Sequence, residues 1–275
     1  MLKFLSFAIF LFISGFGTEQ KKQSEPPPAK IKRVVAIALD GVNEKDIVQP
    51  MTNVAKSMKE LGYEVFWYGE AQNCKVSQPY NLSLPAYATF FSGKQDRRIR
   101  NNWWKGKVFH KTLFDMYPNS QLFSGWGPIK NVMARTLGAL NHGNILAKGI
   151  NEDQRVFDGF FRLYNGSRFS FVHFVDADDF AHMRLESTYH TIAEQEAYRT
   201  LEIMQYVDKR NNKDTLFVIF SDHARGEGKM WHSHGVGIPG SEKMWVMIVT
   251  PTAIEWPLEK CNHIELHDFI IRTLE

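Results

Sequence analysis

Cysteine is scarce in this chain. Cys74 and Cys261 are the only two, and neither belongs to a CxxC pair, which excludes a cysteine-based zinc site and a thioredoxin-like redox motif. Their spacing does not decide whether they form a disulfide. The chain also lacks a strong excess of charge of either sign, since it has 33 Lys and Arg and 30 Asp and Glu. This even, dispersed balance predicts no specific nucleic-acid site.

Long apolar runs are also missing, which argues against a transmembrane helix. The apolar run at residues 4–16 follows Lys3 and ends in small residues, a pattern typical of a secretory signal peptide. We therefore expect a signal peptide at residues 1–18 and an exported chain, periplasmic or secreted. An uncleaved N-terminal anchor is the alternative, and only then do we expect membrane association. The prolines within residues 19–31 predict an extended linker.

The rest of the chain has the composition of a packed domain. The sequence is 44% hydrophobic and contains 21 Phe, which excludes a disordered chain. An almost continuous apolar run, RVVAIAL, predicts a strand covered on both faces of a parallel sheet. Further strands are expected at residues 64–68, 169–175, 215–220 and 244–249, and helices at 51–61, 151–163, 187–207 and 263–274. This order predicts an α/β fold, a three-layer α/β/α sandwich with a mostly parallel central sheet.

Acidic residues follow three of the predicted strands. Asp40 comes after the first strand, Asp176 and Asp178 after FSFVHFV, and Asp222 after LFVIFS. A single Asp-Gly after a strand is an ordinary turn. Because the carboxyl ends of strands form the ligand crevice of open α/β sheets, we expect the three groups to converge in one site.

Histidines accompany these carboxylates. One lies four residues after Asp178, another directly follows Asp222, and two more lie in a Gly-rich loop: His182, His223, His232 and His234. Carboxylate oxygen and imidazole nitrogen suit zinc or a similar divalent ion. With one histidine of the last pair, the six ligands divide into two sets of three, which predicts a two-metal centre for phosphoryl transfer.

Ser83 is the candidate nucleophile. It precedes Pro85 and a predicted helix at residues 84–92, and serine is a favoured helix N-cap. The simplest interpretation is that Ser83 only caps this helix. Capping and catalysis are compatible, because a helix N-terminus favours anions and a neighbouring metal can activate the hydroxyl.

Together these motifs resemble the alkaline phosphatase superfamily, particularly its nucleotide pyrophosphatase/phosphodiesterase-like branch. LDG matches the strand that ends in a metal-binding Asp, and SLPAYATFFSG matches the nucleophile before x-Pro. Residues 178–182 match D-x-x-G-H and residues 221–224 match S-D-H-G, each with Ala in place of the Gly. In WHSHG the closing histidine is best matched by His234, with His232 as the alternative.

The resemblance implies an alkaline phosphatase-like catalytic domain at residues 32–275 with two divalent metal ions, zinc being preferred over manganese by ligand type. One ion is then held by Asp40, Ser83, Asp222 and His223, and the other by Asp178, His182 and His234. Many members of the superfamily place an Asn downstream of the nucleophile, where its amide contacts a phosphoryl oxygen. Asn102 fits that position, with Asn101 next to it.

The implied activity is hydrolysis of a small-molecule or lipid-linked phosphate ester, whether monoester, diester or pyrophosphate, through a phosphoseryl intermediate on Ser83. A sulfatase is disfavoured, because Tyr87 stands where the maturation motif C/S-x-P-x-R has arginine. A phosphomutase is disfavoured by export and by the small size of the chain. A non-catalytic metal-binding protein of this fold is the alternative from another class, and the complete ligand set argues against it.

Other side chains near these motifs have simpler interpretations. Arg225 could pair with phosphate, but a surface arginine in a Gly-rich loop is favoured. Tyr87 and Phe91 recur at helical spacing and are interpreted as core residues. Trp103, Trp104 and Trp231 are weaker candidates for the wall of a substrate pocket.

Overall fold

The computed structural model describes residues 30–133, 145–146, 152–254 and 257–275. The predicted signal peptide and nearly all of the predicted linker lie outside these residues. Within the described ranges, no helix is long and apolar enough to cross a membrane.

In the part of the chain that the structure describes, a seven-stranded sheet forms the middle layer, with strand order β2-β7-β6-β1-β5-β3-β4. Its strands are β1 (Arg33–Leu39), β2 (Glu64–Tyr68), β3 (Gln121–Ser124), β4 (Ile145–Leu146), β5 (Phe169–Phe174), β6 (Thr215–Phe220) and β7 (Val246–Thr250). Neighbouring strands are parallel except where β7 pairs antiparallel with β6 and β2. The predicted mostly parallel sheet is thus confirmed, with the RVVAIAL strand at its centre.

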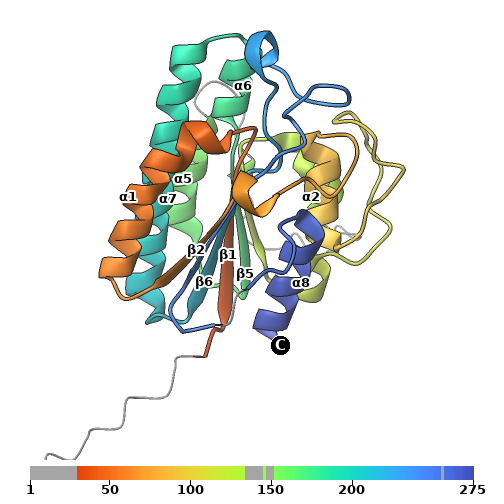
Figure 1. Ribbon diagram of the computed structural model, residues 1–275. Helices are drawn as coiled ribbons and strands as arrows, with labels where there is room; N and C mark the ends of the chain where they lie inside the picture. Colours follow the sequence, from red (N-terminus) through yellow and green to blue (C-terminus); the bar gives the residue numbers. More distant parts are fainter. Residues whose placement is uncertain (1–29, 134–144, 147–151, 255–256) are drawn as a thin grey trace, which may run out of the picture.

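Helices cover both faces of this sheet (Figure 1). On one side lie α1 (Glu44–Glu60), α5 (Glu152–Leu163) and α7 (Glu186–Asn211), and on the other α2 (Ser83–Ser92) and α8 (His263–Leu274). The short helices are α3 (Leu113–Met116), α4 (Lys130–Met133) and α6 (Asp176–His182). Alternate residues of β1 enter the two cores: Val34 and Ala36 pack on the α2–α8 side, Val35 and Ile37 on the other. The predicted three-layer sandwich is confirmed.

The first helix is longer than predicted. We expected it to begin at Met51, just after Pro50. It begins instead at Glu44, so Pro50 lies inside the helix. Buried Ile47 anchors the added turn, and Glu44 and Asp46 place negative charge at the helix N-terminus. Tertiary packing therefore outweighs the local cost of the proline.

Cys74 and Cys261 form a disulfide, which settles the question their spacing left open. Both residues are buried, and the bond joins the segment after β2 to the residues just before α8. It thereby ties the chain that leads into α2 to the helix packed beside α2.

Candidate metal centre and active site

The predicted site residues converge at the carboxyl ends of three strands. Asp40 follows β1, Asp222 follows β6, and Asp178 lies on α6, which begins after β5. Gly41 allows this convergence: its φ is +61°, its N–H donates to Asp222 Oδ1 at 3.1 Å, and a Cβ there would lie 2.3 Å from Asp178 Oδ1. A larger residue would not fit between these carboxylates.

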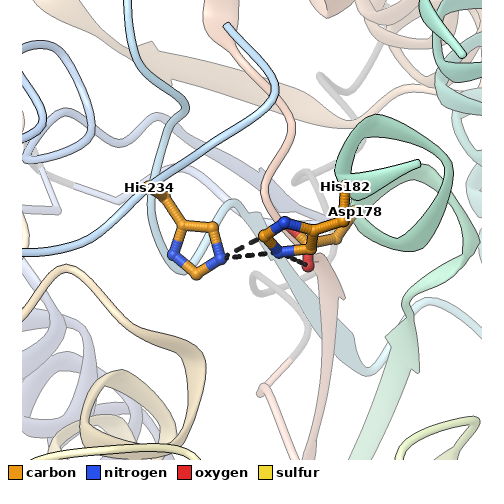
Figure 2. A group of neighbouring side chains, drawn as sticks. All are labelled: Asp178, His182 and His234. Carbon is orange, nitrogen blue, oxygen red and sulfur yellow. Dashed lines mark hydrogen bonds and ion pairs between the residues drawn. The ribbon is translucent and has the colours of Figure 1, made fainter. Parts of the chain in front are cut away.

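Asp178, His182 and His234 form one group, here called the histidine set (Figure 2). Asp178 and His182 lie four residues apart on one face of α6, and His182 Nε2 is 3.1 Å from Asp178 Oδ2. The Nε2 atoms of His182 and His234 are 3.0 Å apart. Because His234 Nδ1 donates to the carbonyl of Asn81 at 2.9 Å, its Nε2 lone pair is free to bind an ion.

Asp40, Ser83, Asp222 and His223 form a second group, here called the serine set. His223 Nε2 lies 3.2 Å from Ser83 Oγ, 3.4 Å from Asp222 Oδ2 and 3.6 Å from Asp40 Oδ1. The Ser83 hydroxyl is also 3.3 Å from Asp40 Oδ1. Among the described residues, buried Asp222 Oδ2 has no hydrogen-bond partner. An unpartnered carboxylate oxygen of this kind suits a cation.

The spacing within both sets matches tetrahedral coordination. Ligand atoms about 2.0–2.1 Å from a tetrahedral ion are roughly 3.3 Å from one another. The separations within the two sets, from 3.0 Å to the 3.8 Å between His234 Nε2 and Asp178 Oδ1, scatter around that value. Single ligand atoms of Asp40, Asp178 and His223 also lie within 4.8 Å of one another, so the two sets are adjacent. The residues present therefore fit two neighbouring divalent ions.

Burial sets the charge of this site. It lowers the pKa of His223 well below the usual range, and because Nδ1 donates to the Ala224 carbonyl, the neutral ring directs its Nε2 lone pair at the serine set. Burial and the charge of Asp40 raise the pKa of Asp222. Burial opposes ionisation of Asp178 too, but Arg225, His234 and His182 together outweigh it and hold the pKa of Asp178 well below its usual range. Bound cations would relieve the cost of gathering these carboxylates.

Ser83 does not cap α2, and that expectation was wrong. It is the first residue of the helix, the extended residue before it is Leu82, and the serine side chain makes no capping bond. Asn81, with a φ of 50°, turns the chain just before the helix. The Ser83 hydroxyl therefore contacts Asp40 and His223 in the site instead of bonding to the helix backbone.

Asn102 lies beside the start of α2. Its Oδ1 accepts from the backbone N–H of Leu84 at 2.9 Å, which satisfies one of the unpaired donors of the first helical turn. Because an N–H can only donate, this contact uses the amide oxygen and leaves Nδ2 as a donor. The predicted contact to a phosphoryl oxygen would therefore have to come from Nδ2.

Sequence reasoning missed two residues that orient Asp40. His173 Nε2 donates to Asp40 Oδ2 at 2.9 Å, and the Tyr87 hydroxyl donates to the same oxygen at 3.1 Å. Ser124 Oγ in turn lies 2.8 Å from His173 Nδ1. Tyr87 is a core residue as predicted, but the pattern did not show its hydroxyl bond. A histidine inside the apolar strand FSFVHFV was the available signal for His173.

Removing the Tyr87 hydroxyl tests this positioning role. In Tyr87→Phe we expect the zinc concentration for half-maximal activity to rise about 10- to 100-fold, because Asp40 loses a bond that fixes its orientation. The matched control is Tyr164→Phe, which removes another buried hydroxyl, one bonded to Asn211 away from the site. If both variants needed the same zinc concentration for half-maximal activity, the Tyr87 bond would stabilise the fold without positioning Asp40 for the metal.

Arg225 is buried, so its interpretation as a surface residue was wrong. It forms an ion pair with Asp178 and donates to the carbonyls of Trp231 and His232, at 3.1 and 2.6 Å. These bonds fix the loop that positions His234 beside Asp178 and His182. The ring of His232 contacts Ser233 Oγ instead, and His232 belongs to neither ligand set.

Ala replaces the family's Gly at two positions without strain. Ala181 lies inside α6 and Ala224 just after the serine set, and neither has a positive φ. Both are buried in spaces that accept a methyl group. The departures from D-x-x-G-H and S-D-H-G therefore leave the backbone of the motifs intact.

A mostly parallel α/β/α sandwich with carboxylates and histidines gathered at the carboxyl ends of its strands defines an alkaline phosphatase-like fold with a candidate two-metal centre. No family model and no curated protein matches the sequence. The fold itself is similar to solved structures, and the resemblance that the motifs predicted is confirmed at this level.

Three of these structures illustrate the similarity. Alkaline phosphatase from the Antarctic bacterium TAB5 is 11% identical, with a TM-score of 0.54 over 89% of this chain and 98% of its own. Murine ectonucleotide pyrophosphatase/phosphodiesterase 5 is 9% identical, with a TM-score of 0.61 over 88% and 95%. The C-terminal periplasmic domain of phosphoethanolamine transferase EptC from Campylobacter jejuni is 12% identical, with a TM-score of 0.57 over 88% and 89%. Identities this low concern the fold alone.

Proposed function

We propose that the chain is a metal-dependent hydrolase of phosphate esters with Ser83 as its nucleophile. The main support is the position of Ser83 Oγ. This atom lies in the first turn of α2, 3.2 Å from His223 Nε2 and 3.3 Å from Asp40 Oδ1. A hydroxyl is thus held among atoms that suit a metal ion, next to a second such set. The structure of an inactive murine phosphodiesterase 5 in complex with AMP shows a phosphate monoester bound on a similar fold.

The histidine set would hold one divalent ion and the serine set the other, with zinc preferred for ligands of this type. When bound, the two ions would supply positive charge that favours the Ser83 alkoxide and stabilises the attacking and leaving oxygens of an in-line displacement. His173 and Tyr87 keep Asp40 Oδ2 occupied, so that Oδ1 faces the serine set.

The reaction then proceeds through the chain's own residues in two steps. Ser83 Oγ gives up its proton and forms a bond to phosphorus while the bond from phosphorus to the leaving-group oxygen breaks; that oxygen leaves with the electron pair and takes up a proton from solvent. The new phosphoserine lies at the N-terminus of α2, where backbone N–H groups favour an anion. Asn102 Nδ2 donates to a phosphoryl oxygen. In the second step water forms a bond to phosphorus while the bond from phosphorus to Ser83 Oγ breaks. Phosphate leaves when the substrate is a monoester and a phosphate monoester when it is a diester, and a proton from the water returns to the serine.

We further propose that residues 1–18 are a signal peptide, residues 19–31 a linker and residues 32–275 the catalytic domain of an exported protein. The Cys74–Cys261 disulfide supports export, because disulfides persist in oxidising compartments outside the cytosol.

Hydrolysis of chromogenic esters tests the activity. Purified chain is treated with a chelator, and cleavage of a phosphate monoester, a phosphate diester and a sulfate ester is measured with and without added zinc. We expect no turnover after chelation and recovery with zinc on a phosphate ester; which ester is cleaved separates a phosphatase from a phosphodiesterase. A preference for the sulfate ester would indicate a sulfatase, and two bound ions with no cleavage would favour a metal-binding protein.

A further inference from the structure

The even overall charge conceals one strongly basic segment. Residues 94–111 contain seven Lys and Arg but a single acid, Asp96, a local net charge of +6. The whole chain has a net charge of +3, so the other residues together carry −3. All seven basic side chains are exposed. This segment, here called the basic loop, follows α2 and contains Asn102.

The basic loop is braced in one conformation. Asp96 accepts from the backbone N–H of Arg98 at 3.1 Å, from its Nε at 2.8 Å and from the N–H of Phe109 at 3.3 Å. The Arg98 guanidinium lies over the rings of Trp104 and Phe109, at 6.0 and 5.5 Å from their centroids. These contacts tie the two ends of the loop together, so its charges are presented on a defined surface.

Large apolar side chains are exposed beside the site on three separate segments. Trp103, next to Asn102, is 85% exposed; Met183, next to His182, is 63% exposed; and Val236, two residues after His234, is 70% exposed. The segments meet at the site, because His182 and His234 are in contact and Asn102 bonds to Leu84 beside the nucleophile. Phe109, 66% exposed, adds a second aromatic ring on the basic loop. The rim of the site therefore combines apolar tips with positive charge.

We propose that this rim and the basic loop dock the folded domain on an anionic lipid surface. Lys and Arg near an anionic leaflet attract it, Trp is enriched at membrane interfaces, and exposed apolar side chains can enter the headgroup region. A single-stranded nucleic acid could use the positive charge and the rings of Trp103 and Phe109, but it would leave the exposed side chains of Met183 and Val236, which offer no ring, without a partner, so a lipid surface suits the whole rim better. The sequence predicted membrane association only through an uncleaved N-terminal segment, whereas this surface belongs to the domain itself.

Vesicle binding tests the docking surface without any measurement of turnover, so it is independent of the proposed hydrolase activity. The full chain is sedimented with vesicles of phosphatidylcholine alone or mixed with phosphatidylglycerol. The test variant carries Arg97→Gln, Arg100→Gln, Lys105→Gln and Lys107→Gln. The control removes the same charge from exposed positions on the helices of the opposite face, with the substitutions Lys56→Gln, Lys59→Gln, Arg162→Gln and Lys209→Gln.

We expect the wild-type chain and the control variant to bind only the anionic vesicles, more weakly as salt is added. Each basic residue near such a surface strengthens binding about fivefold, so even if only two of the four replaced residues lie close to it, the test variant should bind at least about tenfold more weakly. Trp103→Ala should weaken binding to the anionic vesicles about fivefold, which is less than the effect of fully burying a large apolar side chain.

Three results would overturn the proposal. Equal binding by the test and control variants would exclude the basic loop. Equal binding to both kinds of vesicle would indicate insertion of the N-terminal apolar run. Tight binding of a single-stranded oligonucleotide together with no vesicle binding would make the basic loop a nucleic-acid surface.

Discussion

Replacing Ser83 with alanine should lower kcat by at least about 10³-fold, because removal of a catalytic nucleophile leaves only the contribution of binding and charge. Ser83 is buried, and alanine removes only its hydroxyl, so the fold should persist. Zinc content, measured after dialysis, should stay close to two ions per chain, since the other ligands of the serine set are unchanged.

Ser92→Ala is the matched control for Ser83→Ala. Ser92 is the last residue of α2, is also buried, and bonds to the carbonyls of Ala88 and Lys94 away from the site. Its replacement should leave kcat within a few-fold of the wild-type value. Acid quenching of the wild-type enzyme during turnover, followed by peptide mass analysis, should find phosphate on the peptide that contains Ser83. Wild-type turnover by Ser83→Ala would show that the serine is not the nucleophile.

Removing a histidine from the histidine set should have the second large effect. His182→Ala and His234→Ala should each lose one bound ion and at least about 10²-fold in kcat/KM, because even residues that only support a metal ligand contribute 10- to 100-fold. His182 suits this test because its side chain is 47% exposed, so its loss should leave the core intact.

His190 provides the matched control for His182. Its side chain is also 47% exposed and also lies near a carboxylate, that of Asp46 at 3.8 Å, yet it belongs to neither set. His190→Ala should keep both ions and full activity. His232→Ala should do the same, which distinguishes the two histidines of WHSHG. Retention of both ions by His234→Ala and loss of one by His232→Ala would reverse that assignment.

The pH dependence of zinc activation should follow His182. Its hydrogen bond to Asp178 raises its pKa above the usual histidine value of about 6.5. A protonated ring cannot bind a metal, so zinc affinity should fall as the pH drops through this raised pKa. In His182→Ala the remaining zinc affinity should lose that part of its pH dependence.

The sequence predicted the elements well, and also which side chains gather at the candidate site, because both depend on local patterns. Strands β2 and β6 and helix α8 have the predicted bounds, since continuous apolar runs and a clear helical period specify them. Asp178 and His182 share a helix face by spacing alone, and the carboxyl ends of parallel strands must meet at one edge. These rules need no knowledge of distant contacts.

Features that depend on contacts between distant residues were not predicted. The bonds from His173 and Tyr87 to Asp40, the ion pair between Arg225 and Asp178, and the Cys74–Cys261 disulfide all join residues more than 40 positions apart. The charge of residues 94–111 was visible in the sequence, but its place beside the nucleophile depends on the hydrogen bond that the Leu84 N–H donates to Asn102.

Local order along the chain thus determined the strands, the helices and the types of side chain that gather at the candidate metal centre in this protein. Only the tertiary structure decided that Ser83 faces His223 instead of capping its helix, that His234 and not His232 reaches the histidine set, and that Arg225 is buried. The physical reason is that side-chain direction in a loop or at a helix end is set by its packing partners, and those partners lie far away in the sequence.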